Sequence, residues 1–238
     1  MSLPKPTLLL TRPEAASRRF IGQLDQEIMV QVEVVISPLI RIACRTDPIS
    51  FEGIRGLIFS SANGVLSAKS VTDRRDLPCF CVGPATTRAA RQAGWTAHQA
   101  GQDADTLVAA LCRDKPDAPL LHLRGEHGRG DVAQRLTERG LITREQVIYE
   151  QLAEPLTPEA QKALQGSGPV IAPLFSPRTA QLFAAQTPRR AVTVAALSAA
   201  VAQEVAGNAS VRAHVAAQPD AQAMGQLVEK LLQSTLAG

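Results

Sequence analysis

Several turns of this chain combine hydroxyl residues and glycine directly after a run of apolar residues. Ser60 and Ser61 follow the run at 57–59, and Gly83 follows another run at 78–82. If a helix begins at such a turn, its first backbone N–H groups are unpaired and carry positive potential, so the turn can bind a carboxylate. Plain capping of the helix is the alternative explanation. The candidates for anion binding are Ser60, Ser61, Asn63, Gly83, Thr86, Thr87, Ser176, Thr179 and Ser198.

Two arginines occupy comparable places in the two halves of the chain. Arg12 follows the apolar run at 8–10, and Arg124 follows the run at 120–123. A guanidinium group matches a carboxylate with two parallel hydrogen bonds. We therefore predict that both arginines bind an anionic ligand, with a solvated or structural arginine as the alternative.

Tyr149 is the only tyrosine of the chain, and it lies in an apolar stretch that reads as a strand. Its hydroxyl can donate a hydrogen bond or a proton to a ligand. The alternative is an aromatic side chain packed in the core. The four histidines show no spacing of metal ligands, and the chain contains no Walker A, G-x-G-x-x-G, G-x-S-x-G or H-E-x-x-H motif. Phosphoryl transfer, dinucleotide chemistry and triad hydrolysis therefore have no support.

The elements that must position these residues alternate between strands and helices. Short apolar or β-branched runs predict strands, for example at 8–10, 30–36, 57–59 and 192–196. Helical spacing of apolar residues predicts a helix at 13–25, and further helices are expected near 47–55 and at 221–236. This alternation is typical of an α/β fold with a parallel sheet and helices on both faces. Ligands of such sheets bind at the carboxyl ends of the strands, where the turns described above are expected.

The order of these patterns repeats after about 110 residues. Thr11-Arg12-Pro13-Glu14 corresponds to Leu123-Arg124-Gly125-Glu126, and Ile58-Phe59-Ser60-Ser61 corresponds to Leu174-Phe175-Ser176-Pro177. A repeat of this length indicates two related lobes, and a cleft between lobes commonly holds a ligand. We predict a discontinuous first lobe (1–36 and 154–238), a second lobe (44–146) and two connecting strands (37–43 and 147–153).

Composition limits the classes of function. The formal net charge is +3, and the basic residues form no block, which argues against nucleic-acid binding. The four cysteines form no disulfide or metal framework and are predicted to be free thiols, as in a reducing compartment. The chain begins without the pattern of a signal peptide, and no apolar run has the length of a membrane span. We therefore expect a cytoplasmic protein without membrane contact.

Taken together and in this order, the motifs resemble the uroporphyrinogen-III synthase family. The resemblance is carried by the segments Leu10–Pro13, Pro38–Ile42, Phe59–Val65, Val82–Thr87, Ile148–Glu150, Phe175–Thr179 and Leu197–Ser198. It spans nearly the whole chain. One departure is the turn at 195–199, which lacks the Gly-Pro-Thr-Thr form that some members have at that place.

The resemblance implies two flavodoxin-like lobes joined by a two-stranded β linker. It also implies that the enzyme, a lyase, cyclises linear hydroxymethylbilane to uroporphyrinogen III without a metal or organic cofactor. By position, Tyr149 is similar to the tyrosine that assists loss of hydroxide. Ser60, Ser61, Thr86, Ser176 and Ser198 are similar to positions that bind acetate and propionate groups. A monomer, functionally coupled to the upstream bilane-forming enzyme, is expected.

A second hypothesis is a non-enzymatic bilobal domain that binds a small anion or a sugar as an effector. Such domains also combine two α/β lobes with strand crossovers. They normally accompany a signal peptide or a DNA-binding helix-turn-helix, and the chain shows neither pattern.

Overall fold

The computed structural model describes residues 4–128, 130–186 and 191–237. The chain divides into two compact units, and each is described by itself. The first unit contains Met1–Arg41 and Ala153–Gly238, and the second contains Ile42–Leu152. Both units consist of a sheet covered by helices, so the predicted α/β class is confirmed.

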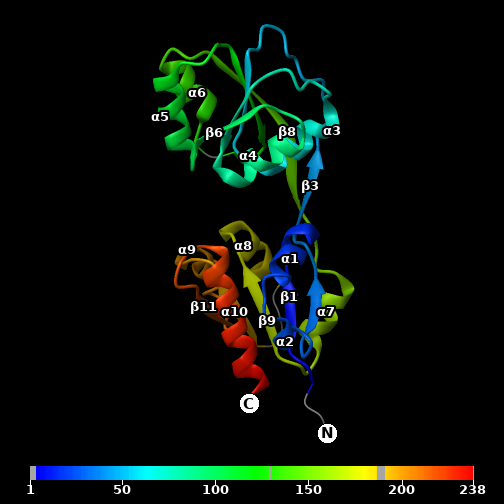
Figure 1. Ribbon diagram of the computed structural model, residues 1–238. Helices are drawn as coiled ribbons and strands as arrows, with labels where there is room; N and C mark the ends of the chain where they lie inside the picture. The colour runs from blue at the N-terminus through cyan, green and yellow to red at the C-terminus, as the bar shows by residue number, and fades with distance from the viewer. Residues whose placement is uncertain (1–3, 129, 187–190, 238) are drawn as a thin grey trace. The chain divides into compact units, whose positions relative to one another are not determined.

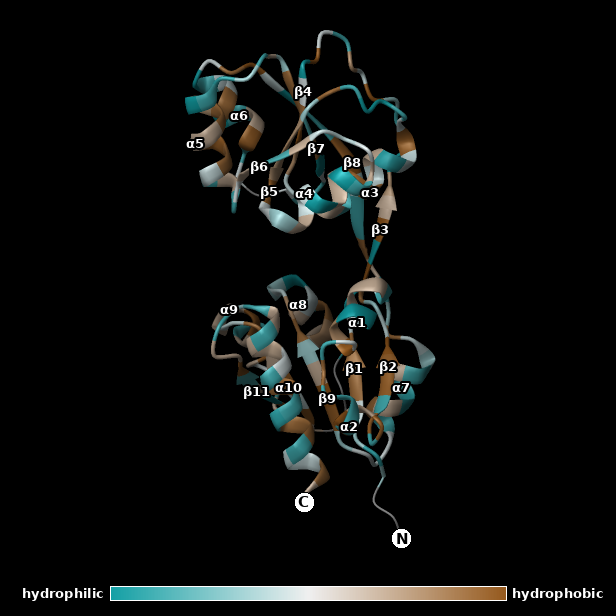
Figure 2. Cartoon of the chain, in the orientation of Figure 1, coloured by the Kyte–Doolittle hydropathy of each residue, from teal (hydrophilic) through white to brown (hydrophobic). Residues whose placement is uncertain are grey.

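The sheet of the first unit has the strand order β11-β10-β9-β1-β2, and its neighbouring strands pair in parallel (Figure 1). β1 and β9 are entirely buried, because helices cover both faces of the sheet. Figure 2 shows β1, β2 and β9 as predominantly hydrophobic segments. The strands are β1 (Thr7–Leu10), β2 (Glu33–Ile36), β9 (Val170–Leu174), β10 (Val192–Ala196) and β11 (Val211–Val215).

Two clusters of apolar side chains form the core of this unit, one on each face of the sheet. Leu9 and Phe183 belong to the cluster under α7, α8 and α9, whereas Leu8, Phe20 and Val228 belong to the cluster under α1, α2 and α10. The alternation of Leu8 and Leu9 follows from the two-residue period of a strand. The helices are α1 (Glu14–Ile21), α2 (Gln26–Met29), α7 (Pro158–Gln165), α8 (Pro177–Ala185), α9 (Ala199–Gln203) and α10 (Ala221–Leu236).

The sheet of the second unit has the order β3-β8-β7-β4-β5-β6. From β8 to β6 all neighbours are parallel. The strands are β3 (Ile40–Cys44), β4 (Gly56–Phe59), β5 (Cys79–Val82), β6 (Ala97–Gly101), β7 (Leu120–Gly125) and β8 (Thr143–Ala153). Beside this parallel part, β3 and β8 run antiparallel, because Arg45 N–H donates to Ile148 O while Glu154 N–H donates to Leu39 O. The sheet is therefore mixed.

Helices again cover both faces of this second sheet. Phe59, Val65 and Leu123 pack in the cluster under α3 and α4, and Ile58 and Leu107 pack in the cluster under α5 and α6. The helices are α3 (Ala62–Val71), α4 (Gly83–Gln92), α5 (Ala104–Asp114) and α6 (Val132–Glu138). Within the described residues, no helix is long and apolar enough to span a membrane.

Three local predictions were wrong. The helix expected near 47–55 is absent, and the segment is irregular, with Gly53 at a φ of 72°. The helix expected at 13–25 ends at Ile21, and α2 begins separately where the Asp25 side chain accepts a hydrogen bond from Glu27 N–H at 2.8 Å. Strands β6 and β11 were missed, because polar residues interrupt their apolar runs: histidine and glutamine in β6, and arginine and histidine in β11.

Candidate functional site

The candidate residues of each unit lie at the carboxyl ends of neighbouring strands. In the first unit, Arg12, Ser176 and Ser198 follow β1, β9 and β10, which are adjacent in the sheet. In the second unit, the candidates lie on or after β8, β7, β4 and β5, which are also adjacent. Parallel strands end at one edge of their sheet, so each unit gathers its own set of candidates there.

The turn between β4 and α3 carries Ser60, Ser61 and Asn63. Ser61 is the N-cap of α3, and its hydroxyl oxygen accepts a hydrogen bond from Asn63 N–H at 3.2 Å. Ser61 therefore has the capping role that was the alternative explanation, although its own hydroxyl hydrogen can still be donated. Ser60 is half-buried, and its hydroxyl lies 3.0 Å from Nε2 of His122.

The turn between β5 and α4 offers backbone donors. Gly83 has a φ of 73°, a left-handed conformation that favours glycine. Gly83 is the first residue of α4, and the N-cap residue is Val82, whose apolar side chain cannot accept a hydrogen bond from the first N–H groups of this helix. Thr87 donates its hydroxyl hydrogen to Gly83 O at 2.9 Å, whereas Thr86 is buried without a hydrogen bond of its hydroxyl to another described residue.

In the first unit, the turn after β9 is a closed capping arrangement. Ser176 is the N-cap of α8; its hydroxyl accepts from Thr179 N–H at 3.2 Å and lies 2.8 Å from the Thr179 hydroxyl. Ser198, after β10, is different. It stands at the N-cap of α9, but its side chain makes no capping hydrogen bond. Of the two candidate serines in this unit, Ser198 is therefore the one whose hydroxyl is not used in a helix cap and stays available to a ligand.

The two arginines that the repeat treats as equivalent have different surroundings. The Arg124 guanidinium is hydrogen-bonded within the protein. Its Nη2 donates to Glu145 Oε1 at 2.6 Å, and its Nη1 donates to the carbonyl oxygens of Gly125 and Glu126 at 3.0 and 3.2 Å. The hydrogen bond with Glu145 raises the pKa of Arg124 and lowers that of Glu145. Arg124 is therefore held by the protein itself, as its structural alternative predicted.

Arg12 has no carboxylate or carbonyl partner among the described residues. Its guanidinium lies over the ring of Phe175, 4.1 Å from the ring centre, and Phe175 packs edge-on against Phe20. Burial, together with the charge of Arg19, lowers the pKa of Arg12 from its ordinary value. A half-buried cation without an anion is stabilised when a ligand supplies one, so Arg12 has the surroundings of an anion-binding residue.

Tyr149 is nearly buried, and a β-bulge sets the direction of its side chain. The pairing of β7 with β8 shifts by one residue, because Arg124 lies opposite Val147 but Gly125 lies opposite Tyr149. Such a shift turns the following side chains to the other face of the sheet. Ile148 and Tyr149 consequently pack in the same apolar cluster although they are consecutive.

The Tyr149 ring lies directly over the backbone of Gly125. A Cβ atom on Gly125 would lie 2.5 Å from Cζ and 2.8 Å from the hydroxyl oxygen of Tyr149. The hydroxyl makes no hydrogen bond to another described residue, and its oxygen is not fully enclosed by the protein. The ring is therefore packed as a core aromatic, as the alternative predicted, while its polar end can still meet a ligand.

Sequence reasoning gave no role to His122, which the structure places beside Ser60. His122 lies on β7 and is 2% exposed. Burial lowers its pKa to about 4, a shift that the charge of Glu145 opposes and that of Arg124 reinforces. The imidazole is therefore neutral at pH 7. The missing signal was the register of β4 with β7, which sets Ile58 against His122 and brings Ser60 within reach.

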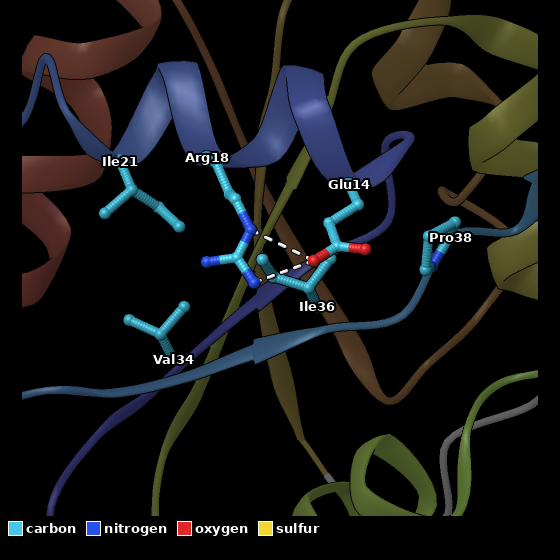
Figure 3. Close-up of a pocket in the computed structure, with 6 residues that line it drawn as sticks. All are labelled: Glu14, Arg18, Ile21, Val34, Ile36 and Pro38. Carbon is cyan, nitrogen blue, oxygen red and sulfur yellow. Dashed lines mark hydrogen bonds and ion pairs between the residues drawn. The ribbon is translucent and has the colours of Figure 1, made fainter.

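A surface pocket of about 600 Å³ lies elsewhere in the first unit, between α1 and β2 (Figure 3). Its lining includes Glu14 and Arg18, which pair with each other at 2.7 Å, and the side chains of Ile21, Val34 and Ile36. The charge of its cation is thus neutralised within the pocket, and none of the predicted site residues lines it. The pocket does not have the character of an anion site.

The described part of the chain contains no group of three or more histidine, cysteine or acidic side chains that could hold a metal ion. The cysteines in this part form no disulfide. Burial raises the pKa of the Cys81 thiol to about 11, so this thiol is protonated at neutral pH.

Residues 30–226 match the family described as "Uroporphyrinogen-III synthase HemD". A comparison with curated proteins found no significant match.

Two solved bacterial structures illustrate the similarity in fold. Uroporphyrinogen-III synthetase from Helicobacter pylori has a TM-score of 0.70 at 15% identity, with 95% of this chain and 99% of that chain covered. A mutant uroporphyrinogen III synthase from Thermus thermophilus has a TM-score of 0.52 at 14% identity, with 96% and 99% covered. At these identities the likeness shows the fold.

Proposed function

The chain belongs to the uroporphyrinogen-III synthase family, and we propose that it converts linear hydroxymethylbilane to uroporphyrinogen III, as a cyclising lyase of tetrapyrrole biosynthesis. The observation that carries this conclusion is the family match, which spans more than four fifths of the chain. The resemblance seen in the sequence motifs is thereby confirmed. A non-enzymatic effector domain for sugars or small anions is not favoured by any of the matches.

The reaction has modest chemical demands on the protein. Loss of the terminal hydroxyl of hydroxymethylbilane gives an azafulvene. Ring closure through a spiro-pyrrolenine then inverts ring D and yields the type III isomer. The protein must hold a flexible poly-acid so that the correct carbons meet, a kind of positioning that can lower a barrier by about 7–11 kcal/mol. No covalent intermediate with a side chain is required.

The acetate and propionate groups of the bilane are the anions that the strand-end residues would bind. Arg12 supports this assignment most strongly, because it is a half-buried cation without a partner among the described residues. Ser60, Thr86 and Ser198 have hydroxyl groups that no helix cap consumes, and α4 begins with unsatisfied N–H groups. Weaker support remains for the substrate-binding roles predicted for Ser61, Asn63, Gly83, Thr87, Arg124, Ser176 and Thr179, several of which already serve helix caps or an ion pair.

Tyr149 is the group we assign to proton donation as hydroxide leaves. Two observations support the role: its ring is fixed by packing across Gly125, and its hydroxyl has no partner among the described residues. A fixed donor with an unused proton is suited to general acid catalysis.

We also propose that the two units are flavodoxin-like lobes, with lobe 1 at 1–36 and 154–238, lobe 2 at 44–146, and connecting strands at 37–43 and 147–153. The strand order supports this arrangement. Numbered by their order within the first unit, its strands lie in the sheet as 2-1-3-4-5, the flavodoxin order. The parallel strands of the second unit give the same order if counting begins at β7, as expected when a chain enters a duplicated lobe at a different point.

The decisive experiment supplies purified protein with hydroxymethylbilane and separates the uroporphyrinogen isomers after oxidation. We expect the type III isomer. Formation of only the type I isomer, the product of spontaneous closure, would show that the chain lacks the proposed activity. Because the free bilane closes spontaneously, we further propose functional coupling of a monomeric enzyme to the upstream bilane-forming enzyme. Sedimentation of the protein alone and with that enzyme tests this proposal.

A further inference from the structure

The pair formed by Ser60 and His122 has a feature that plain packing leaves unexplained. Nε2 of His122 lies 3.0 Å from the Ser60 hydroxyl, whereas Nδ1 is fully enclosed and has no hydrogen-bond partner among the described residues. A buried polar atom without a partner costs free energy. Burying the imidazole thus costs folding free energy. Among the described side chains, its hydrogen-bond partner is Ser60.

The missing partner at Nδ1 determines where the neutral ring carries its proton. With the proton on Nδ1, the interior would hold a donor without an acceptor. With the proton on Nε2, it would hold only an unused lone pair, and unpaired buried donors are the rarer case in proteins. The ring therefore carries its hydrogen on Nε2, and Nε2–H donates to the Ser60 oxygen. The hydroxyl hydrogen of Ser60 is then directed away from His122.

We propose that His122 is a positioning residue that makes the Ser60 hydroxyl a hydrogen-bond donor to a carboxylate of the substrate. This inference rests on the proposed function. The contact suits an anion, because Ser60 is half-buried and follows β4 at the sheet edge, while the neighbouring Arg124 is already paired with Glu145 and does not compete for the ligand. In the opposite arrangement Ser60 would donate to Nε2 and would present only lone pairs, which repel a carboxylate.

A double-mutant cycle in the bilane assay tests the inference. Ser60→Ala removes the donor, and we expect KM to rise about tenfold, the size of one hydrogen bond to a charged group. His122→Leu should raise KM by a similar factor, with kcat within about threefold of wild type, and the double variant should be no worse than either single variant. His122→Gln is the matched control: its amide nitrogen lies near the place of Nε2, so KM should stay within about twofold of wild type.

Folding and function are separated by two further measurements. Thermal melting checks that each variant is folded, and the wild-type protein establishes independently whether the type III isomer is formed. The ¹⁵N shifts of the His122 ring report its tautomer directly. A proton on Nδ1, a KM unchanged by Ser60→Ala or by His122→Leu, or strictly additive effects of the two changes would each overturn the inference.

Discussion

Substitution of Gly125 by alanine should disturb the reaction through Tyr149. The new Cβ would lie 2.5 Å from Cζ and 2.6 Å from Cε2 of the tyrosine ring. These distances are about 1 Å shorter than van der Waals contact between carbon atoms. The backbone of Gly125 is itself compatible with alanine, because its φ is not in the left-handed region. The ring must therefore move, and its hydroxyl moves with it.

Two opposing effects determine the change in stability. Overpacking of a core typically costs about 1–3 kcal/mol. Replacing a strand glycine by alanine recovers about 0.5–1 kcal/mol of backbone entropy. Gly125→Ala should therefore lower the free energy of unfolding by about 1–2 kcal/mol. For a chain of this size that corresponds to a fall in Tm of roughly 2–8 °C. A displacement of about 1 Å at the proton donor should lower kcat about a hundredfold.

The same substitution in a Tyr149→Ala background isolates the clash. Without the ring, alanine at position 125 meets no Tyr149 side chain, so it should be neutral or slightly stabilising. The coupling between the two substitutions should then be about 1–3 kcal/mol by chemical denaturation. Gly207→Ala is the control, because no atom lies within 4 Å of its added Cβ, and it should leave melting and turnover unchanged. An equal loss of stability in both backgrounds would refute the argument that the ring is positioned by Gly125.

Three further predictions concern the other polar groups. Tyr149→Phe should lower kcat by several-fold to about a hundredfold while the Tm changes little, and an unchanged rate in the isomer assay would remove the hydroxyl from the mechanism. Arg12→Gln should raise KM about tenfold with a small loss of stability, whereas Arg124→Gln should mainly lower the Tm, because it leaves Glu145 without its partner; equal effects on KM would contradict this division. His122 binds its proton at pH 6.5 when unfolded but only near pH 4 when folded, so wild type should lose a few kcal/mol of stability as the pH falls through this window, and His122→Leu should lose less; identical acid profiles of the two proteins would contradict the buried, neutral state.

Local patterns in the sequence were sufficient for the alternation of strands and helices. The terminal helix occupies Ala221–Leu236, as expected, and the buried runs at β1 and β4 are strands. These elements were predicted correctly because the pattern of apolar residues within each segment indicates which of its side chains are buried. The helix expected at 47–55 is absent for the opposite reason: the segment has no long apolar period, and Gly53, with a φ of 72°, interrupts it.

The chemistry of the site was less accessible, because it depends on residues that are distant in the sequence. The repeat gave Arg12 and Arg124 one role, but Glu145 comes from the next strand and neutralises only Arg124. His122 showed no motif, since its partner Ser60 is 62 residues away and meets it through strand register. From the sequence, Gly125 was recognised only as part of a repeat. The structure shows why a glycine is needed there: the Tyr149 ring lies against its backbone, across the bulge.

Two units of similar fold must differ in their site residues if they are to bind a substrate whose two ends differ chemically. In the first unit, β1 and β2 pair without a register shift, and Arg12 has no anionic partner among the described residues. In the second unit, the corresponding pair β7 and β8 contains the bulge that aims Tyr149, and Glu145 neutralises the corresponding arginine. A free cation close to a proton donor would hold a carboxylate where hydroxide must leave. Under the proposed function, this divergence gives strong anion binding to the first unit and proton donation to the second, because the arginine near Tyr149 is already paired with Glu145 and does not hold a substrate carboxylate there.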